Sequence, residues 1–460
     1  MATANIPQRV HLVGVGGAHM SAIARILLSR GHEVSGSDQK VSATTVQLEQ
    51  QGMRFELGHE PAHARSAQLV VYTVAVPADN PELGAARSTG IEVITRAQMV
   101  SRLLDGLRVV AVSGAHGKTT TSSLIAYLLK SSGMSPTYLV GGDADALGGN
   151  AAAGDGEWGV VEADEYGRAF LEYEPEIAVV TNVEADHLDY YGDYDSLKAA
   201  FRQFLERVQA EGVIIAATGS EGLDDVLEKA RPTARILRYG ANGAATWKGS
   251  KLSREGGLQS FRLMGEGQDY GSFSIALPGL HNVWNAVGGI AAAIKAGAEV
   301  EIMRSALPHF TGARRRFELI GEANGISVYD DYAHHPTEIA VNVQAAKDRF
   351  PGRRLVVLFQ PHTYSRTRYL LDEFRTCFQG IDRLFILETF AAREAIAEGI
   401  EASALADAVT TPPATYLGSH EEALAALEKE LKSGDVFFTM GAGDVNNVGP
   451  DLLNRLGGGD

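Results

Sequence analysis

The sequence predicts an α/β protein of three domains, each built around a mostly parallel sheet. The chain has 460 residues, which is too long for one compact core. Short apolar runs rich in β-branched residues alternate with helix-like segments over most of its length, a pattern typical of sheets covered on both faces. Gly-rich turns and polar residues follow several of these runs, at the strand ends where parallel sheets bind their ligands.

The composition excludes several classes of protein. A net charge of -16 argues against nonspecific nucleic-acid binding. The one cysteine, Cys377, excludes an intrachain disulfide framework and a cysteine zinc cluster, and we expect it in the core. The first residues lack the pattern of a signal peptide, and no apolar run approaches the ~18 residues of a membrane span. We therefore expect a cytoplasmic protein with no membrane contact and no obligate protein partner.

The first domain is predicted to cover residues 1–106 with a Rossmann-like fold. Its first strand and helix read RVHLVGVGG and SAIARILLSRG, and further strands read HEVSGSD, QLVVYTVAV and IEVITRA. The turn GVGGAH approaches the dinucleotide fingerprint, although His19 occupies the third glycine position. Asp38 lies 22 residues beyond Gly16, a spacing that suits a ribose-binding acid. A nicotinamide-dependent oxidoreductase is therefore an alternative hypothesis for this segment.

The second domain, residues 107–312, is predicted to be a P-loop ATPase-type domain with a parallel sheet. The strand LRVVAVSG runs into GAHGKTTT at 114–121, and a helix follows. Val112 stands where a standard phosphate loop has its first glycine, but Gly114 and Gly117 still allow the backbone to curl around phosphate. Lys118 would reach the terminal phosphates of ATP. The residues assigned to ATP in this loop are Gly114, His116, Gly117, Lys118, Thr119 and Thr120.

Three side chains that could hold a magnesium ion follow corresponding strands of the second domain. Thr119 follows the first strand, Glu162 follows WGVV, and His187 follows IAVVTNVEAD. Oxygen ligands suit magnesium, whereas an imidazole ligand is unusual for it. Each residue alone would be explained by a turn, a capping or paired carboxylate, or an ordinary histidine. Their joint placement predicts a magnesium–ATP site.

The rest of the chain continues the α/β pattern after one interruption. Residues 240–277 are Gly-rich with short alternating pieces, which predicts antiparallel hairpins, and the helix NVWNAVGGIAAAIKAG follows. The third domain, residues 313–460, is predicted to be Rossmann-like α/β, with the strands ISVYDD, RRLVVLFQP, RLFILETF and DVFFTMGAG. We expect the terminal GGGD to be frayed.

Seven motifs occur in a fixed order along the chain: GAHGKTTT, EADEYGRAFL, TNVEADHLDYY, PGLHNVWNA, GARRRFE, DDYAHHPTE and FQPHTYSRTR. With them the chain resembles the Mur ligase family from Gly14 to Asp444, and that family's short Gly-x-x-Gly-Lys-Thr loop accounts for Val112. The resemblance implies a UDP-sugar domain, a central ATPase domain and a third domain that closes with the amino acid. The implied activity is ATP- and Mg²⁺-dependent ligation of L-alanine to the lactyl carboxylate of UDP-N-acetylmuramate through an acyl phosphate. A ligase that recycles a tripeptide onto the same sugar is the alternative within the family.

The resemblance also implies roles for individual residues. The diphosphate of the sugar nucleotide would lie on Gly14, Gly16 and Gly17, with Asp38 near the uridine. The residues implied at the adenine and phosphates of ATP are His281, Asn282, Asn285, Arg316 and Asp331. Those implied at the alanine and the acyl phosphate are His334, His362 and Arg366. The implied catalytic set is Lys118, His187, Arg316, Asp331, His334, His362 and Arg366.

Some of these residues also have ordinary structural explanations. Asn282 could cap a helix, and the basic triplet that ends in Arg316 could be solvated surface. The chain departs from the family at His19, where glycine is usual, and at Thr363, where arginine is frequent. The position at which some Mur ligases carry a carbamylated lysine is apolar here, at Phe201, so we predict no carbamylation.

Overall fold

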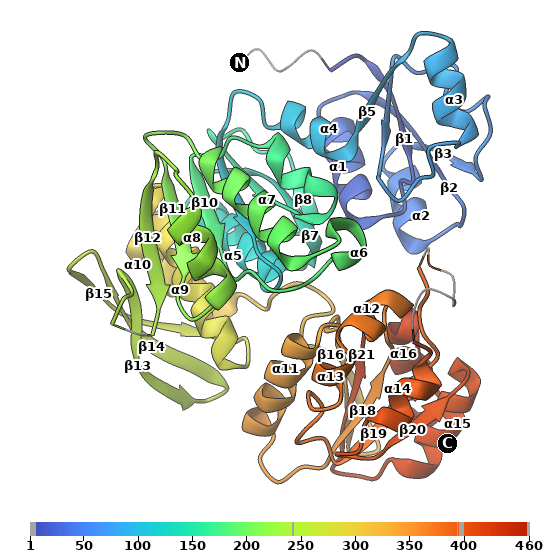
Figure 1. The fold of residues 1–460 in the computed structure, drawn as a ribbon, viewed down its shortest axis with the longest axis vertical. Coiled ribbons are helices and arrows are strands. Elements are labelled where there is room, and N and C mark those ends of the chain that lie inside the picture. The colour runs from blue at the N-terminus through green and yellow to red at the C-terminus, as the bar shows by residue number, and fades with distance from the viewer. Residues whose placement is uncertain (1–5, 242, 393, 395–399, 458–460) are drawn as a thin grey trace.

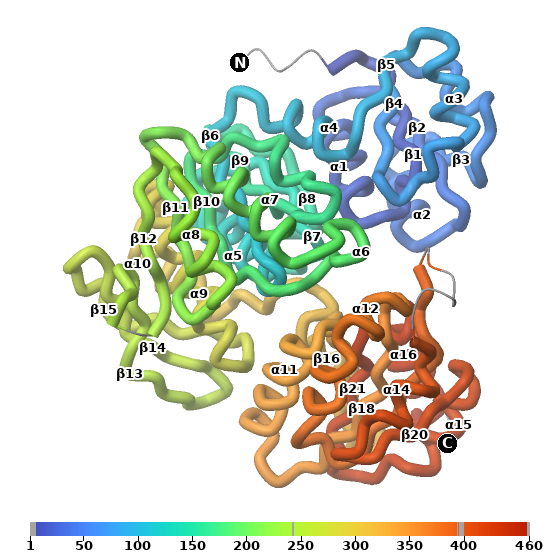
Figure 2. Tube along the Cα trace, in the orientation of Figure 1, coloured from blue at the N-terminus to red at the C-terminus, as the bar shows by residue number. Residues whose placement is uncertain are grey.

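Three sheets divide the protein into three lobes, and the chain passes once from each lobe into the next (Figures 1 and 2). The computed structural model describes residues 6–241, 243–392, 394 and 400–457. Of the terminal GGGD, all but Gly457 lies outside the described residues. The predicted three-domain α/β fold is confirmed.

The N-terminal sheet is parallel throughout, in the order β3-β2-β1-β4-β5. Its strands are β1 (Arg9–Val13), β2 (Glu33–Asp38), β3 (Arg54–Leu57), β4 (Leu69–Tyr72) and β5 (Glu92–Thr95), and its helices are α1 (Ala18–Ser29), α2 (Ala43–Gln50), α3 (Pro81–Ser88) and α4 (Arg96–Leu103). The strand order reverses between β1 and β4, and the glycine turn after β1 lies at this switch point. Ligands of open α/β sheets bind at such a point.

The central sheet has the order β15-β14-β13-β12-β11-β10-β6-β9-β7-β8. Its strands are β6 (Arg108–Ser113), β7 (Thr137–Ala144), β8 (Gly149–Ala152), β9 (Trp158–Glu162), β10 (Ile177–Val180), β11 (Val213–Ala217), β12 (Arg235–Gly240), β13 (Trp247–Glu255), β14 (Leu258–Gly265) and β15 (Gln268–Ile275). Its helices are α5 (Lys118–Ser131), α6 (Leu188–Tyr191), α7 (Tyr194–Glu206), α8 (Glu221–Lys229), α9 (Leu280–Lys295) and α10 (Val300–Ala306), with the 3-10 turns η1 (Tyr166–Glu172) and η2 (Leu307–His309). The predicted hairpins are confirmed as the antiparallel strands β13, β14 and β15. A further antiparallel pair, β7 with β8, was not predicted.

The C-terminal sheet has the order β16-β17-β21-β18-β19-β20, and only its edge strand β16 is antiparallel. Its strands are β16 (Glu318–Ala323), β17 (Ile326–Asp331), β18 (Leu355–Phe359), β19 (Arg383–Leu387), β20 (Ala414–Leu417) and β21 (Val436–Met440). Its helices are α11 (Pro336–Arg349), α12 (Tyr364–Tyr369), α13 (Leu371–Phe374), α14 (Ala402–Ala408), α15 (His420–Glu430) and α16 (Val448–Gly457), with the 3-10 turn η4 (Asp444–Asn447). Cys377 is buried in this core, as predicted.

The apolar core is continuous across the first two lobes and separate in the third. One cluster of buried side chains runs from Val10 to Phe310, and α1 packs against β7 and β8 of the central sheet. The clusters of the C-terminal lobe contain only residues of that lobe, among those the structure describes. Polar interfaces between domains permit relative motion more readily than apolar ones. The first two lobes therefore form one base, against which the third can move.

A buried carboxylate surrounded by histidines lies inside the N-terminal lobe. Glu82, near the start of α3, accepts a hydrogen bond from the Ser37 hydroxyl at 2.7 Å. Its carboxylate oxygens lie 2.7 Å from His63 Nδ1, 3.1 Å from His59 Nδ1 and 3.7 Å from His11 Nε2. Burial alone would raise the pKa of Glu82, but hydrogen bonds from His11, Ser37 and His63 outweigh it and lower the pKa to about 2.

Replacing Glu82 by glutamine is expected to lower the free energy of unfolding at pH 7 by about 2–3 kcal/mol. A carboxylate whose folded pKa is depressed stabilises the fold above its unfolded pKa, and this contribution is lost as pH falls through its folded pKa. The difference from the parent protein should therefore shrink as pH falls from about 4.5 toward about 2. Urea unfolding across this pH range measures it, with the exposed Glu60→Gln as control. A difference that stays constant with pH would contradict an ionic origin.

Candidate active site

The turn between β6 and α5 has the backbone geometry of a phosphate-binding loop. Gly114 and Gly117 have φ values of +134° and +80°, which residues with a side chain rarely adopt. A Cβ atom at Gly114 would overlap the Thr181 hydroxyl, so the close approach of the two strand ends requires glycine there. Helix α5 begins directly at Lys118, and its first amides face the loop. The loop can therefore hold an anion at a helix N-terminus.

Lys118 is held inside this loop as a cation. Its Nζ donates to the carbonyls of Gly114 at 2.6 Å and Ala115 at 3.2 Å, and to Glu165 Oε1 at 2.9 Å. Burial lowers the pKa of Lys118, but the carboxylates of Glu165, Asp164 and Glu162 outweigh it and raise the pKa above its ordinary value. A charged ammonium group therefore lies at the place where the loop would bind phosphate.

The three predicted magnesium ligands line one cavity of about 880 Å³, together with Lys118, and we call it the cation cavity. Thr119 comes from the start of α5, Glu162 from the end of β9 and His187 from the turn before α6. Glu162 Oε2 accepts the amide N–H of Gly141 at 2.9 Å, and a Cβ atom at Gly141 would overlap this carboxylate. The absence of a side chain at Gly141 in β7 therefore leaves room for the Glu162 carboxylate.

Two carboxylates that the sequence analysis did not assign to the metal, those of Asp164 and Glu165, lie near His187. Ligand-type atoms of Asp164, Glu165 and His187 lie within 4.8 Å of one another, and His187 Nε2 is 3.7 Å from Glu165 Oε1. Glu165 Oε2 is buried and has no hydrogen-bond partner among the described residues. Burial raises the pKa of Glu165, whereas at Asp164 the cations Arg96 and Lys118 outweigh burial and lower the pKa to about 2. This oxygen-rich donor set, with one orphaned oxygen, fits a hard divalent cation such as Mg²⁺.

The predicted adenine residues line a second, narrower cavity between the central and C-terminal lobes. Its lining includes the central-lobe residues His116, Gly117, Thr120, His281, Asn282 and Asn285, and the C-terminal-lobe residues Arg316 and Asp331. The N-cap of α9 is Gly279, and the Asn282 side chain donates to the Pro278 carbonyl at 2.7 Å, so Asn282 does not cap the helix. Asn285 donates to Asn282 Oδ1 at 3.2 Å, which fixes both amides.

Burial shifts the pKa values of two predicted residues in this second cavity, His281 and Asp331. Burial lowers the pKa of His281 to about 4, so its imidazole is neutral near pH 7. Burial also raises the pKa of Asp331 to about 7, against the opposing charge of Arg316. Asp331 accepts the amide N–H groups of Phe317 and Ala333, each at 2.7 Å. Arg316 lines both this cavity and the cation cavity.

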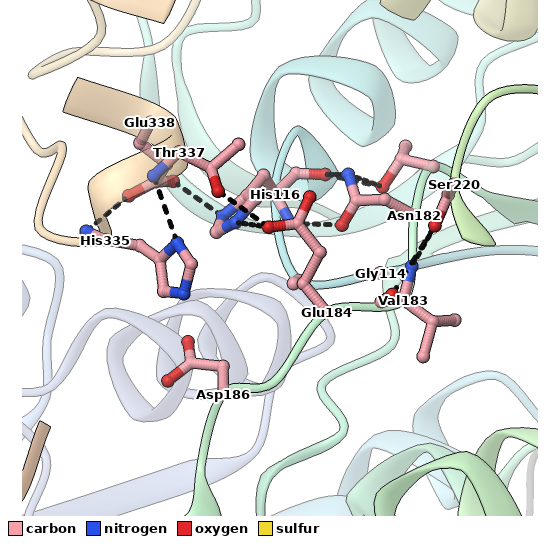
Figure 3. A network of polar contacts seen from close by, with 12 residues as sticks. Gly114, His116, Asn182, Val183, Glu184, Asp186, Ser220, His335, Thr337 and Glu338 are labelled. Atoms are coloured by element: carbon pink, nitrogen blue, oxygen red, sulfur yellow. Dashed lines mark hydrogen bonds and ion pairs between the residues drawn. The ribbon is translucent and has the colours of Figure 1, made fainter. Parts of the chain in front are cut away.

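A polar network joins the phosphate loop to the start of α11 (Figure 3). His116 places Nε2 at 3.2 Å from Glu184 and Nδ1 at 3.4 Å from Glu338, and the Thr337 hydroxyl donates to Glu184 at 2.8 Å. Burial lowers the pKa of His116, but the two glutamates outweigh it and raise the pKa to about 10. Atoms of His116, Glu184 and His335 also lie within 4.8 Å of one another, but the charged imidazolium already satisfies the carboxylates. The motif interpretation missed Glu184, Thr337 and Glu338, because their pairing depends on how two lobes dock.

The residues that the sequence analysis placed at the L-alanine substrate contact the central lobe at a second buried site. Arg366 donates to Asp186 Oδ1 through Nε at 3.2 Å and Nη2 at 2.8 Å, and its Nη1 donates to His362 Nδ1 at 2.9 Å. Despite burial, the Arg366 guanidinium holds the pKa of Asp186 well below its usual range. In this structure Arg366 is therefore bound to a carboxylate of the protein itself.

His334 lies beside this contact as a neutral base. Its Nδ1–H donates to the Tyr332 carbonyl at 2.9 Å, and its ring centre is 5.7 Å from that of His362. Burial, with a further contribution from Arg366, lowers the pKa of His334 to about 4. Because Nδ1 carries the proton, Nε2 is the acceptor. Thr363, the departure from the family pattern, precedes α12 with φ +66°.

The predicted sugar-nucleotide residues divide between two cavities. Gly14, Gly17 and Asp38 line a third cavity beside the glycine turn of the N-terminal lobe, which we call the glycine-turn cavity, whereas Gly16 lines the cation cavity. Asp38 Oδ2 accepts the Gly16 amide N–H at 2.9 Å, so this carboxylate braces the glycine turn. Ala392, from the C-terminal lobe, also lines the third cavity.

The described residues contain no helix with the length and apolar character that crossing a bilayer requires.

Comparisons with known proteins agree with this architecture. Sequence models of the Mur ligase family match each lobe: the family's catalytic domain at residues 9–108, the Mur ligase middle domain at 112–293 and the glutamate ligase domain at 315–443. The chain is 41% identical to the UDP-N-acetylmuramate–L-alanine ligase of Symbiobacterium thermophilum over 459 residues, which cover 98% of this chain and 95% of that protein. It is also 41% identical to the ligase of the same name from Mycolicibacterium vanbaalenii, covering 98% and 96%.

Solved structures give the same result. The UDP-N-acetylmuramate–alanine ligase of Thermotoga maritima superposes with a TM-score of 0.83 at 28% identity, covering 97% of this chain and 98% of that one. A murein peptide ligase from Psychrobacter arcticus superposes with a TM-score of 0.77 at 27% identity, covering 98% and 99%.

Proposed function

The chain belongs to the Mur ligase family, and we propose that it joins L-alanine to the lactyl carboxylate of UDP-N-acetylmuramate at the expense of ATP. The products are UDP-N-acetylmuramoyl-L-alanine, ADP and phosphate, a step of peptidoglycan precursor synthesis in the cytoplasm. The observation that carries this proposal is the full-length identity of about 40% to several ligases of that name. The domain assignment that accompanies it is 1–106 for the UDP-sugar, 107–312 for ATP and 313–460 for the amino acid.

The proposed reaction needs positive charge around the phosphoryl group that moves. ATP would lie with its phosphates on the loop at Gly117 and its base in the cavity of His281 and Asn285. Lys118 and Arg316 would stabilise the charge that develops on the transferring oxygens. Magnesium, bound by residues of the set Thr119, Glu162 and His187 with the neighbouring carboxylates, would supply further positive charge there.

The second half of the proposed reaction needs a neutral amine beside the acyl phosphate. The carboxylate of alanine suits the fork of the Arg366 guanidinium, since two parallel N–H groups can bind its two oxygens. The neutral Nε2 of His334 would accept a proton from the ammonium group, which frees the amine to attack. The amine displaces phosphate through a tetrahedral intermediate. Both residues already line the cation cavity, and closure of the C-terminal lobe would bring them nearer to the reacting groups.

Phosphate release tests the proposal directly. With ATP, Mg²⁺ and UDP-N-acetylmuramate present, release should depend on added L-alanine and stop when the divalent ion is chelated. Absence of alanine-dependent release would end the proposal. Release that depends instead on the tripeptide L-alanyl-γ-D-glutamyl-meso-diaminopimelate would favour the recycling ligase. Tight binding of a nicotinamide cofactor, followed by its fluorescence, would favour the oxidoreductase, which the family membership and the GKTT loop do not support.

A further inference from the structure

His19 stands at a position where the glycine fingerprint has no side chain. It is the second residue of α1, directly after the glycine turn, and α1 packs against β7 and β8 of the central lobe. The imidazole therefore lies at the seam between the N-terminal and central lobes. The backbone at His19 does not require glycine, because the residue lies inside a regular helix after the turn.

The ring of His19 has hydrogen-bonding capacity that the free protein does not use. Nε2 is sealed from solvent and has no hydrogen-bond partner among the described residues. Burial lowers the pKa of His19, and the nearby Arg96 contributes to the same shift. The imidazole is thus neutral near pH 7, with one N–H donor. A buried nitrogen without a partner costs free energy, and the cost is recovered when the ring, which lines two cavities, turns to present its N–H to a ligand atom.

His19 also lies where a long ligand would have to pass. Within the described part of the chain, the glycine-turn cavity and the cation cavity share three lining residues, which are Ala18, His19 and Asp164. A sugar nucleotide with its nucleoside near Asp38 and its carboxylate near Lys118 must cross this passage. Ala18 offers no side-chain donor, and Asp164 is an anion paired with Arg96 at 3.0 Å. His19 is therefore the side chain of the three that can donate to an anionic ligand.

We propose that the imidazole N–H of His19 donates a hydrogen bond to the diphosphate of the sugar nucleotide as it passes from the glycine turn to the cation cavity. The inference rests on the proposed function, because it takes the UDP-sugar as the ligand of this passage. The glycine turn itself contributes only backbone N–H groups. His19 adds a side-chain donor, so it strengthens binding of the diphosphate and leaves the ATP loop unchanged.

Direct binding measurements separate this contact from the rest of the reaction. The full-length protein is titrated calorimetrically, without ATP, with UDP-N-acetylmuramate and with UDP. His19→Ala should raise Kd for both ligands by about tenfold or more, the size expected for a lost hydrogen bond to a charged group. His19→Gln, which keeps an N–H donor of similar reach, should recover most of the affinity. Kd for ATP should be unchanged in both variants.

Each outcome is informative. Equal Kd values for His19→Ala and the parent protein would overturn the contact. A loss for UDP-N-acetylmuramate but not for UDP would also overturn it, because the lost contact would then lie on the sugar. Failure of the parent protein to bind either ligand would overturn the proposed function and this inference together. Thermal unfolding of each variant shows that the fold is kept, and a loss of ATP binding in His19→Ala would indicate a structural defect and overturn the specific role.

Discussion

Replacing Lys118 by alanine is expected to lower kcat for alanine-dependent phosphate release by about 10²–10³-fold. The ammonium lies inside the phosphate loop, where it touches two loop carbonyls and Glu165. A charge fixed before the reaction stabilises the transferring phosphoryl oxygens without reorganisation, which is why its loss falls on kcat. Kd for UDP-N-acetylmuramate should change less than kcat, because only the lactyl carboxylate of that ligand would lie near Lys118 and the rest would lie on the N-terminal lobe. Steady-state kinetics and titration measure the two quantities.

Two variants make the Lys118 test specific. Lys130→Ala removes an exposed lysine from the last turn of the same helix and should keep full activity. Lys118→Arg keeps a cation beside Glu165 and should protect the fold, yet its planar fork cannot reproduce a point charge inside the loop. If Lys118→Ala released phosphate at the parent rate, the assignment of the loop to ATP would be wrong.

Replacing Arg366 by alanine is expected to lower kcat/KM for L-alanine by at least about 10²-fold, with little change in KM for ATP. The variant loses the proposed grip on the alanine carboxylate and also leaves Asp186 buried without its cation. Each lost hydrogen bond to the alanine carboxylate would cost about 1.5–3 kcal/mol, and each 1.4 kcal/mol is a factor of ten in kcat/KM. The broken ion pair lowers the stability of the fold instead, by about 3–5 kcal/mol. Initial rates at varied alanine and varied ATP separate the two KM values.

The neighbouring residues supply the controls for Arg366. Arg368→Ala, two positions along α12 and exposed, should behave like the parent protein. Asp186→Asn distinguishes the two roles of Arg366, because it removes the contact between lobes but leaves the guanidinium. A large loss in Arg366→Ala with little loss in Asp186→Asn would assign the arginine to the substrate. A parent-like kcat/KM in Arg366→Ala would contradict both roles.

The strand ends were predictable from the sequence because their signal is local. A buried apolar run followed by a turn and a helix defines where β6, β9 and β10 stop, and the chemistry follows in the next residues. Lys118, Glu162 and His187 each follow such a strand end, and they line one cavity. The hairpins of 240–277 were predictable for the same reason, since alternation along a strand is also local.

The features that were missed depend on contacts distant in sequence. Arg366 meets Asp186 only because the third lobe docks on the second, and no periodicity encodes that docking. Within EADE, the choice among Glu162, Asp164 and Glu165 depends on the path of the backbone after β9. The strand pair β7 and β8 was hidden because its sequence, TYLVGGDADALGGNAA, is broken by glycines that weaken the strand pattern.

Ala392 belongs to the lobe that would deliver the amino acid, yet it forms part of the wall around the glycine-turn cavity. When that lobe is seated, Ala392 covers part of the cavity in which a nucleotide sugar would lie. We therefore expect the nucleotide sugar to enter and leave more readily when this lobe is undocked. Turnover would then depend on how often the third lobe lifts away as well as on the speed of bond formation.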